Sequence, residues 1–387
     1  MSNKVGLAIV TYTVNYGTFL QAFATQTAVR ALGYETEILN INSVIGDVSK
    51  DRKKYFISQV FNLAELKSYR HTISAIIEKR INRTYKRYIA NRERRFNEFS
   101  DKYFHIGKKC NSWSGLTAYC ENFSSILVGS DQLWRPANIA GNFYTLNFVP
   151  DHINKVSYAT SFGLKEVRDN QKEIAAAFLS RIQFLSCREE SGIKIIENLT
   201  GREAKVVCDP TLLLKQCDWE QFLPVKPIVD GDYILVYLLS NNKEHRNYVK
   251  KLAQRTSCKV VGVLHGAGYI KGDEDFVDEA PSDIGPFDFL NLIKNAKYIC
   301  TDSFHGCVFS TIFEKNFYAF KRFSDKDKMS TNTRVTGLLS RFDLCDRLVE
   351  DYDELFFNEI DYVKVNKKVE EFRNYSFGFL TDALGHI

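Results

Sequence analysis

Short apolar runs alternate along this chain with longer stretches in which apolar residues recur at helical spacing. The first run, residues 5–10, predicts a buried strand, and the apolar positions between Phe19 and Leu32 predict a helix that ends at Gly33. Further strands of the first half are expected at 37–41, 125–128, 156–160, 184–187 and 204–208. Strands that alternate with helices in this way are typical of a mostly parallel sheet with helices on its faces.

The same alternation starts again near Asp232. Strands are expected at 233–239, 259–264, 298–301 and 317–320, and helices at 244–255, 286–295, 304–313 and 334–341. Pro224, Pro227 and Gly231 cluster just before this second series and mark a boundary. We therefore predict an α/β protein of two Rossmann-like domains with a cleft between them. The domains are expected at 1–222 and 223–365, with a closing helix at 366–387.

A change of period interrupts the first domain. Apolar residues at helical spacing from about residue 63 to 99 predict a long amphipathic helical insertion, which extends with its basic residues to about 109. Between Lys67 and Lys109 there are thirteen Lys or Arg and four Asp or Glu, although the whole chain has a net charge of only +5. The basic face has two interpretations. It is a solvated helix surface, or it contacts anionic lipid headgroups or a polyprenyl diphosphate that carries an acceptor sugar.

Composition excludes several classes of protein. No run approaches eighteen apolar residues, and the first residues lack the apolar core of a secretion signal, so we expect a cytoplasmic protein. The nine cysteines are scattered without a C-x-x-C pair, which favours reduced core thiols over a metal site. No reader motif accompanies the basic segment, so no nucleic-acid partner is expected. P-loop, G-x-G-x-x-G, Ser-His-Asp elbow and H-E-x-x-H signatures are absent as well.

Small, polar and charged residues gather where the expected strands end. These positions are 15–17, 129–132, 160–163, 188–190, 302–306 and 321–322. In open α/β sheets, ligands bind outside the carboxyl ends of the strands. Six polar loops at that end therefore predict one coherent site.

The sharpest of these loops is Asp302-Ser303-Phe304-His305-Gly306. A helix that begins here leaves its first N–H groups and its positive dipole end facing the loop, which suits an anion such as phosphate. His305 can donate a proton near neutral pH. The alternative is that Asp302 or Ser303 only caps the helix and that His305 packs at its start.

Arg188 and Asp131 are the next candidates. The Arg188 guanidinium can hold a carboxylate or phosphate with two hydrogen bonds, or it can form an ion pair with Glu189 or Glu190. Asp131 can accept hydrogen bonds from sugar hydroxyls, hold a general base, or cap a turn.

Three further residues have both a functional and a structural interpretation. Trp134 can stack on a sugar ring or lie in the core. Lys321 and Arg334 can neutralise phosphate, or they can be ordinary surface charges.

Taken together and in order, these loops resemble the polysaccharide pyruvyl transferase family. The matching stretches are Asn15-Tyr16-Gly17 with Leu20-Gln21-Ala22, Val128-Gly129-Ser130-Asp131-Gln132-Leu133-Trp134, Ser157-Tyr158-Ala159-Thr160-Ser161-Phe162-Gly163, Arg188-Glu189-Glu190-Ser191-Gly192, Cys208-Asp209-Pro210-Thr211-Leu212-Leu213, Gly285-Pro286 with Phe289-Leu290, Ile293 and Asn295-Ala296, Thr301-Asp302-Ser303-Phe304-His305-Gly306, and Asn332, Arg334 and Leu338-Leu339. They cover residues 5 to 340. The basic insertion and the C-terminal segment carry none of these motifs.

The resemblance implies a fold similar to the GT-B glycosyltransferases. It also implies a reaction in which pyruvate from phosphoenolpyruvate forms a cyclic ketal across two hydroxyls of a hexose, in the synthesis of capsule, exopolysaccharide or cell-wall polymers. His305 is then the main catalytic residue, assisted by Asp131, and Arg188 binds the donor. For Lys321 the match is looser, and Lys326 or Lys328 can take its role. Such chemistry needs phosphoenolpyruvate as co-substrate and neither a redox cofactor nor a metal.

The same resemblance predicts which residues contact the two substrates. They are Asn15, Tyr16, Gly17, Gln21, Ser130, Gln132, Trp134, Ser161, Asp302, Ser303, Gly306, Lys321 and Arg334. Two other functions compete with this one. A GT-B-like glycosyltransferase would use a sugar nucleotide, and a non-catalytic protein of the same fold would only bind carbohydrate.

Overall fold

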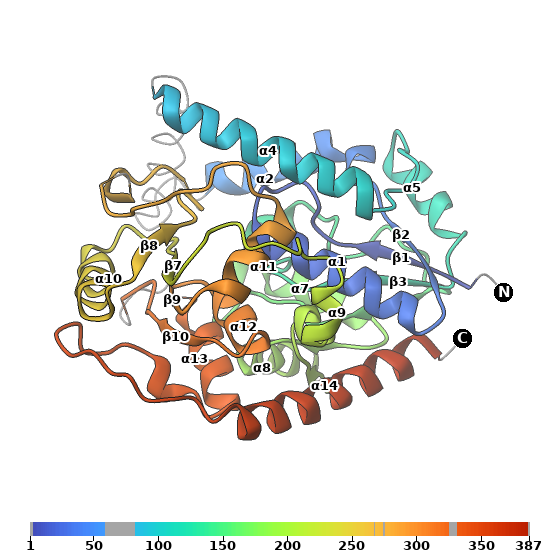
Figure 1. Cartoon of the computed structure of the whole chain (residues 1–387). Coiled ribbons are helices and arrows are strands. Elements are labelled where there is room, and N and C mark those ends of the chain that lie inside the picture. The colour runs from blue at the N-terminus through green and yellow to red at the C-terminus, as the bar shows by residue number, and fades with distance from the viewer. Residues whose placement is uncertain (1–2, 59–81, 267, 274, 325–330, 386–387) are drawn as a thin grey trace.

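Two parallel β-sheets form the centre of the molecule (Figure 1). The computed structural model describes residues 3–58, 82–266, 268–273, 275–324 and 331–385. The N-terminal sheet has the order β2-β1-β3-β4, and the C-terminal sheet has the order β10-β9-β7-β8. The strands of the first are β1 (Lys4–Ala8), β2 (Glu35–Ile38), β3 (Ser125–Val128) and β4 (Asn154–Ser157). Those of the second are β7 (Tyr233–Tyr237), β8 (Lys259–Gly262), β9 (Tyr298–Thr301) and β10 (Asn316–Ala319).

A short parallel pair extends the N-terminal sheet. It consists of β5 (Ser186–Cys187) and β6 (Lys205–Val206). Backbone bridges from Val156 to Phe184 and from Thr160 to Cys187 connect it to the edge at β4. The carboxyl end of β6 is thereby brought to the same edge of the sheet as the ends of β1 and β3.

Helices cover both sheets, and the apolar strand sequences follow from this cover. Every residue of β3 and β7 is buried, because parallel strands between helical layers have no solvent-facing side. The helices of the N-terminal lobe are α1 (Tyr16–Ala31), α2 (Ile45–Ser58), α4 (Arg83–Tyr103), α5 (Trp113–Cys120), α6 (Pro136–Ala140), α7 (Asp169–Ser180), α8 (Glu190–Thr200) and α9 (Gln216–Glu220). The later helices are α10 (Lys243–Thr256), α11 (Pro286–Asn295), α12 (Phe304–Ile312), α13 (Asn332–Arg341) and α14 (Tyr362–Gly385).

The predicted fold class, two Rossmann-like α/β lobes in tandem as in GT-B proteins, is confirmed by these two parallel sheets. Element boundaries differ in places. The strand expected at 37–41 is Glu35–Ile38, because the Asn40 side chain accepts a hydrogen bond from Asn42 N and starts a 3-10 turn. The expected loop 15–17 is shorter too: Asn15 caps α1 by accepting from Thr18 N, so the helix already begins at Tyr16.

The basic insertion is described only from residue 82, and there its main helix lies across both lobes. Apolar rings of α4 pack on the N-terminal lobe, where the Phe96 ring centroid lies 4.7 Å from that of Phe19. On the other side, Arg92 is buried and donates to the carbonyls of Leu264 (2.5 Å) and His265 (3.2 Å).

The next basic residues of α4 also bind the C-terminal lobe. Arg94 pairs with Asp283 and Arg95 with Asp288, each at 2.5 Å. The expectation of a wholly solvated or lipid-facing basic face is therefore wrong for this part of the helix. Arg83, Lys86 and Arg87 are exposed, and for them contact with anionic headgroups stays a prediction. The predicted helical segment 63–81 lies outside the described residues.

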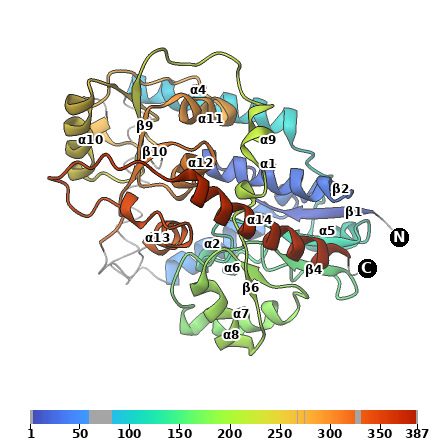
Figure 2. The same ribbon diagram turned by 60° about the horizontal axis from the view of Figure 1, so that its bottom comes forward.

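The last helix joins the lobes from the opposite side (Figure 2). Its first residue, Tyr362, donates to Lys315 O of the C-terminal lobe at 2.6 Å. Farther along α14, Ser376 Oγ accepts from Cys208 N, and Ala383 O accepts from the Asn154 amide, both at 2.8 Å in the N-terminal lobe. Of the helices described, none combines the length and apolar character needed to cross a bilayer.

We expect Arg92→Ala to lower the free energy of unfolding by about 2–4 kcal/mol, because two buried carbonyls lose their donor and a void remains. Urea unfolding of the full chain measures this. Arg94→Ala on the same helix is the control, since its exposed ion pairs are worth about 0–1 kcal/mol. Equal losses for the two variants would contradict the role given to Arg92.

Candidate active site

The two sheets bring their switch points face to face. In each sheet the chain reverses its winding direction between the first strand and its neighbour, at β1/β3 and at β7/β9. A crevice opens at such points because the following loops diverge to opposite faces. A cavity of about 480 Å³ lies there, lined by the loops that follow β1, β3, β7 and β9 and by residues of α2, α6 and α13.

Asp131 forms the N-terminal wall of the cavity. Its backbone lies in the left-handed region with a φ of 81°, a conformation that non-glycine residues adopt mainly in turns and functional sites. Thr18 Oγ1 donates to its carboxylate at 2.7 Å and Gln132 N at 2.8 Å. Burial raises the pKa of this carboxyl, but the charges of Arg188 and His305 outweigh burial and leave the pKa below its usual value. Asp131 is therefore an anion in a fixed orientation.

The start of α12 forms the opposite wall. Ser303 caps this helix, accepting from Gly306 N at 3.4 Å. Asp302 lines the cavity, but its carboxylate accepts from Leu239 N (2.6 Å) and Ser240 N (2.9 Å). Its main role is thus to tie the loop after β7 to the loop after β9, which places His305 at the cavity.

A buried carboxylate connects the walls. Asp209 follows β6 and is 2% exposed. Its carboxylate accepts hydrogen bonds from Arg188 Nη1 at 3.0 Å and from Ser130 Oγ at 2.9 Å. Thr211 donates to its other oxygen through both its N–H and its hydroxyl. His305 Nε2, from the other lobe, lies 3.6 Å from Asp209 Oδ2. Burial raises the pKa of Asp209, yet the charges of His305 and Arg188 lower it far below its ordinary range.

The other ring nitrogen of His305, Nδ1, lies close to the backbone of α1 at Gly17. A Cβ atom placed on Gly17 would lie 2.1 Å from His305 Nδ1, so the imidazole occupies the space that a side chain at position 17 would need. Gly17 was expected to contact substrate. The structure gives it a different role, because its missing side chain lets α1 approach the ring.

Arg188 lies behind the cavity wall. Its side chain is 1% exposed, with Glu189 Oε2 at 3.5 Å and Asp131 Oδ1 at 3.8 Å from its nitrogens, and its guanidinium lies 4.8 Å from the Phe304 ring centroid. The ion-pair alternative holds for Glu189, whereas Glu190 pairs with Arg341. In this structure Arg188 holds the carboxylates that surround His305, and direct binding of the donor by Arg188 stays a prediction.

Four arginines line the cavity itself, namely Arg52, Arg135, Arg322 and Arg334. Arg334 Nη2 donates to Thr331 Oγ1 at 3.0 Å, and within the described residues its Nε has no hydrogen-bond partner. Burial, together with the nearby charge of Arg188, lowers the pKa of Arg334 to about 9, which still leaves it protonated at neutral pH. An anion bound here would relieve both effects.

The predicted site residues divide into three groups, of which two belong to the site. Those that line the cavity are Asn15, Asp131, Gln132, Asp302, Ser303, His305 and Arg334. Those that support it from behind are Gly17, Ser130, Ser161, Arg188 and Gly306. Ser161 Oγ, for example, donates to Glu189 at 2.5 Å, and Gly306 leaves room for Thr301, whose Oγ1 lies 2.3 Å from a Cβ built there.

Four predicted contacts are corrected by burial or distance. Trp134 is 1% exposed and donates to Tyr144 O, so it is a core residue and no sugar platform. Tyr16 is equally buried and donates to Ile284 O. Gln21, with no exposed surface, donates to Thr18 O. Lys321 pairs with Glu350 at 3.7 Å, while Arg322 lines the cavity instead. Lys326 and Lys328 lie outside the described residues.

Sequence reasoning missed several residues in or behind the cavity wall, and only some of them carried a signal. Asp209 follows an expected strand, where ligand-binding residues are expected, yet it was not among the predicted site residues. Arg52 lies inside the helix α2 and Tyr12 in a loop, where nothing in the pattern distinguishes them from surface residues. Arg322 was passed over in favour of its neighbour Lys321.

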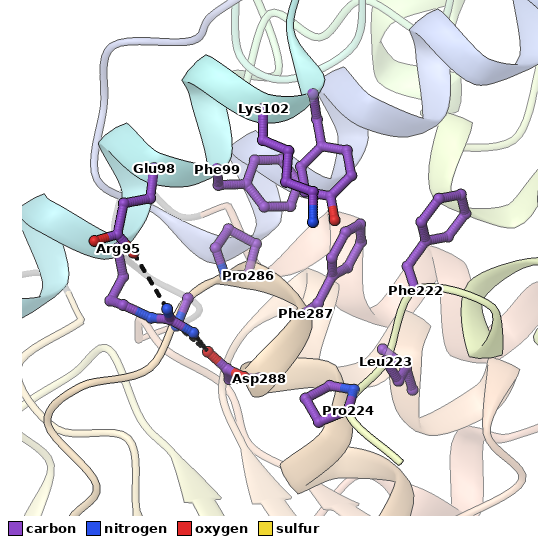
Figure 3. A pocket seen from close by; sticks show the side chains of 12 residues that line it. Arg95, Glu98, Phe99, Lys102, Phe222, Leu223, Pro224, Pro286, Phe287 and Asp288 are labelled. Carbon is purple, nitrogen blue, oxygen red and sulfur yellow. Dashed lines mark hydrogen bonds and ion pairs between the residues drawn. The ribbon is translucent and has the colours of Figure 1, made fainter.

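A second hollow of about 370 Å³ lies where α4 meets the start of α11 (Figure 3). The rings of Phe99, Tyr103, Phe222 and Phe287 line it together with charged residues of α4 and α11. The Phe222 and Phe287 rings are stacked at 5.3 Å, and Arg95 is held by Glu98 and Asp288 at the rim. The cavity between the switch points differs because it gathers His305, Asp131 and free guanidinium nitrogens, and we assign it as the candidate active site.

The described residues contain neither a cluster of possible metal ligands nor a disulfide. In residues 3–58, 82–266, 268–273, 275–324 and 331–385, no three His, Cys, Asp or Glu side chains are grouped as metal ligands. The nine cysteines are free thiols, and burial raises the pKa of Cys300 and Cys307 well above the usual value.

The fold and site define a two-lobed α/β protein with ionisable side chains in the cleft between its Rossmann-like lobes. The model of the family described as polysaccharide pyruvyl transferase matches residues 15–322, and the chain belongs to this family. No curated protein matches the chain significantly.

Several solved structures are similar to this chain at low sequence identity. A UDP-GlcNAc 2-epimerase from Methanocaldococcus jannaschii, in complex with UDP-GlcNAc and UDP, is 13% identical with a TM-score of 0.47, covering 96% of this chain and 93% of that one. The glycosyltransferase SnogD from Streptomyces nogalater is 11% identical with a TM-score of 0.48, covering 99% and 100%. The E. coli heptosyltransferase WaaC with ADP is 10% identical with a TM-score of 0.39, covering 95% and 99%. These values are too low to assign an activity.

Gly17→Ala should displace the His305 ring without unfolding the protein. The added methyl group collides with the imidazole, while alanine is itself a better helix former than glycine. The imidazole resonances of His305, assigned with a His305→Asn variant, should shift in histidine NMR spectra. Gly378→Ala in α14, where a Cβ atom meets open space, is the matched control and should leave them in place. Unchanged resonances in Gly17→Ala would contradict the confinement of the ring.

Asp209→Asn should cost about 3 kcal/mol of unfolding free energy, because Arg188 then keeps a buried charge that has lost its nearest partner. Ser130→Ala removes only one neutral donor from the same carboxylate and should cost about 1 kcal/mol. Chemical denaturation of both variants tests the difference. A loss in Asp209→Asn no larger than in Ser130→Ala would argue against the ion-paired junction.

Proposed function

We propose that this protein transfers pyruvate from phosphoenolpyruvate to two hydroxyls of a hexose in a polysaccharide, forming a cyclic ketal and releasing phosphate. The observation that carries the proposal is the position of His305. This histidine stands at the lobe boundary, within the cavity, between the Asp209 carboxylate and the space above Gly17. Family membership supports polysaccharide pyruvylation, and the geometry supplies an acid where a small anionic donor would lie.

Phosphoenolpyruvate carries a phosphate and a carboxylate, and the cavity offers cations for both. Arg322 and Arg334 reach it from the C-terminal lobe. The first turn of α12 directs its positive dipole end at the same wall. Guanidinium groups bind such anions with paired hydrogen bonds, so the donor would lie along this wall with its double bond toward His305.

The reaction can then be written with its protons balanced. His305 gives a proton to the methylene carbon of the donor, and one sugar hydroxyl forms a bond to the central carbon. The proton of that hydroxyl passes to the Asp131 carboxylate and returns to His305. The bond from the central carbon to the phosphate oxygen then breaks, and the electron pair leaves with the phosphate. The second hydroxyl closes the ketal, and its proton leaves on hydrogen phosphate.

Each residue at the cavity has a defined part in this proposal. Asp131, oriented by Thr18, stabilises positive charge at the central carbon. The Asp209 carboxylate, 3.6 Å from His305 Nε2, stabilises the protonated imidazole, and Arg188 keeps Asp209 and Asp131 ionised. No step requires a redox cofactor, because the carbon framework is neither oxidised nor reduced overall.

His305→Ala should lower phosphate release from phosphoenolpyruvate by about 10²–10⁴-fold, the usual contribution of a general acid. The assay uses the full chain with phosphoenolpyruvate and hexose glycosides, and it follows inorganic phosphate. His152→Ala is the control, because His152 is exposed and pairs only with Glu121 among the described residues. Full turnover by the His305→Ala variant would remove this residue from the mechanism.

A thermal-shift comparison separates the proposal from its rival. Phosphoenolpyruvate alone should raise the melting temperature of the protein, because ligand binding to the native state stabilises it. Stabilisation by UDP-GlcNAc but not by phosphoenolpyruvate would favour a glycosyltransferase that uses a sugar nucleotide.

A further inference from the structure

An exposed aromatic ring stands in the wall of the cavity. Tyr12 lies in the loop after β1, lines the cavity and is 45% exposed. Most large aromatic side chains of the chain are buried, and those of Trp134 and Tyr144 next to this loop are only 1% exposed. A phenol ring left open to solvent inside a cavity is a feature of ligand sites, where aromatic side chains provide apolar contact area.

The edge of this ring is fixed by hydrogen bonds. Arg52 Nη2 and the Tyr144 hydroxyl both donate to the Tyr12 hydroxyl at 3.4 Å. Arg52 is itself held by Asn138 Oδ1, to which the same nitrogen donates at 2.7 Å. Tyr12 is therefore anchored through its polar tip while the ring remains uncovered, so its position is set before any ligand arrives.

Polar groups of several kinds line the cavity together with this ring. They belong to Thr13, Asn15, Arg52, Arg135 and Asn138. Together they present hydroxyl, amide and guanidinium groups. Arg52 has no carboxylate partner within the described residues, and its buried Nε has no hydrogen-bond partner there. An apolar ring face beside hydroxyl-binding groups matches a pyranose, which has C–H bonds on one face and hydroxyls around its edge.

We propose that Tyr12 is the stacking platform for a pyranose ring, whose hydroxyls bind Arg52 and Asn138. That this sugar is the acceptor rests on the proposed function, because the donor would occupy the opposite wall beside Arg334. The platform places the sugar at the face of the cavity formed by Asp131, where its hydroxyls can reach the central carbon of the donor. Tyr12 thus takes the role that the sequence suggested for Trp134.

Ligand-observed NMR titration of the full chain tests this site with three probes: methyl β-D-galactopyranoside, methyl β-D-glucopyranoside and methyl α-D-mannopyranoside. At least one should bind the wild-type protein, with the strongest saturation transfer on the C–H protons of a single pyranose face. Tyr12→Ala should weaken that glycoside about tenfold, since an aromatic contact contributes about 1 kcal/mol. Tyr12→Phe keeps the ring and should stay within about threefold of the wild type.

Tyr375→Ala is the matched control, because Tyr375 is 51% exposed on α14, outside the cavity lining, and its removal should leave glycoside affinity unchanged. The proposal is overturned if none of the three glycosides binds the wild-type protein, if Tyr12→Ala binds as tightly as the wild type, or if Tyr12→Phe loses as much as Tyr12→Ala. Failure of the proposed function shows separately, as a missing thermal shift with phosphoenolpyruvate, and does not affect the glycoside titrations.

Discussion

The candidate site is organised around the buried carboxylate of Asp209. An isolated charge in a protein interior is strongly unfavourable, so this group requires partners, and it draws them from separate parts of the chain. Arg188 comes from the end of β5, Ser130 from the loop after β3, and His305 from the start of α12 in the other lobe. The carboxylate thus brings together three segments of the chain, one of them from the other lobe, at the point where chemistry is proposed. Asp302 and Asp131 complete this arrangement by fixing the loops on either side.

Much of the fold follows from the sequence because parallel strands buried on both faces must be apolar along their whole length. The strands at 125–128 and 298–301 were predicted with the bounds that the structure shows. The same geometry explains why strand ends identified His305 and Asp131. The direction in which a side chain points cannot be predicted from its position at a strand end. Trp134 follows β3 as Asp131 does, yet its indole turns into the core, and Arg188 turns behind the wall.

Functional contacts made by residues within helices were the hardest to predict. Arg52 reaches the cavity from the middle of α2, where a basic residue is most often solvated. The arginines of α4 were expected to face solvent or lipid, but three of them bind the C-terminal lobe, because the helix lies across the gap between the domains. A one-dimensional pattern records which residues share a helix face. It does not record what lies opposite that face, and both errors arise from this.

The path of α14 has a consequence for how the chain acquires its structure during synthesis. Domains usually fold as units, with the N-terminal one first, as they leave the ribosome. Here the N-terminal lobe depends on late residues, because Asn154 and Cys208 receive hydrogen-bond partners from Ala383 and Ser376. That lobe therefore emerges without part of its surface cover and stays incomplete until the last helix has been translated. Until α14 has been made, the growing chain leaves exposed the apolar surface that Leu380, Ala383 and Leu384 cover in the folded protein.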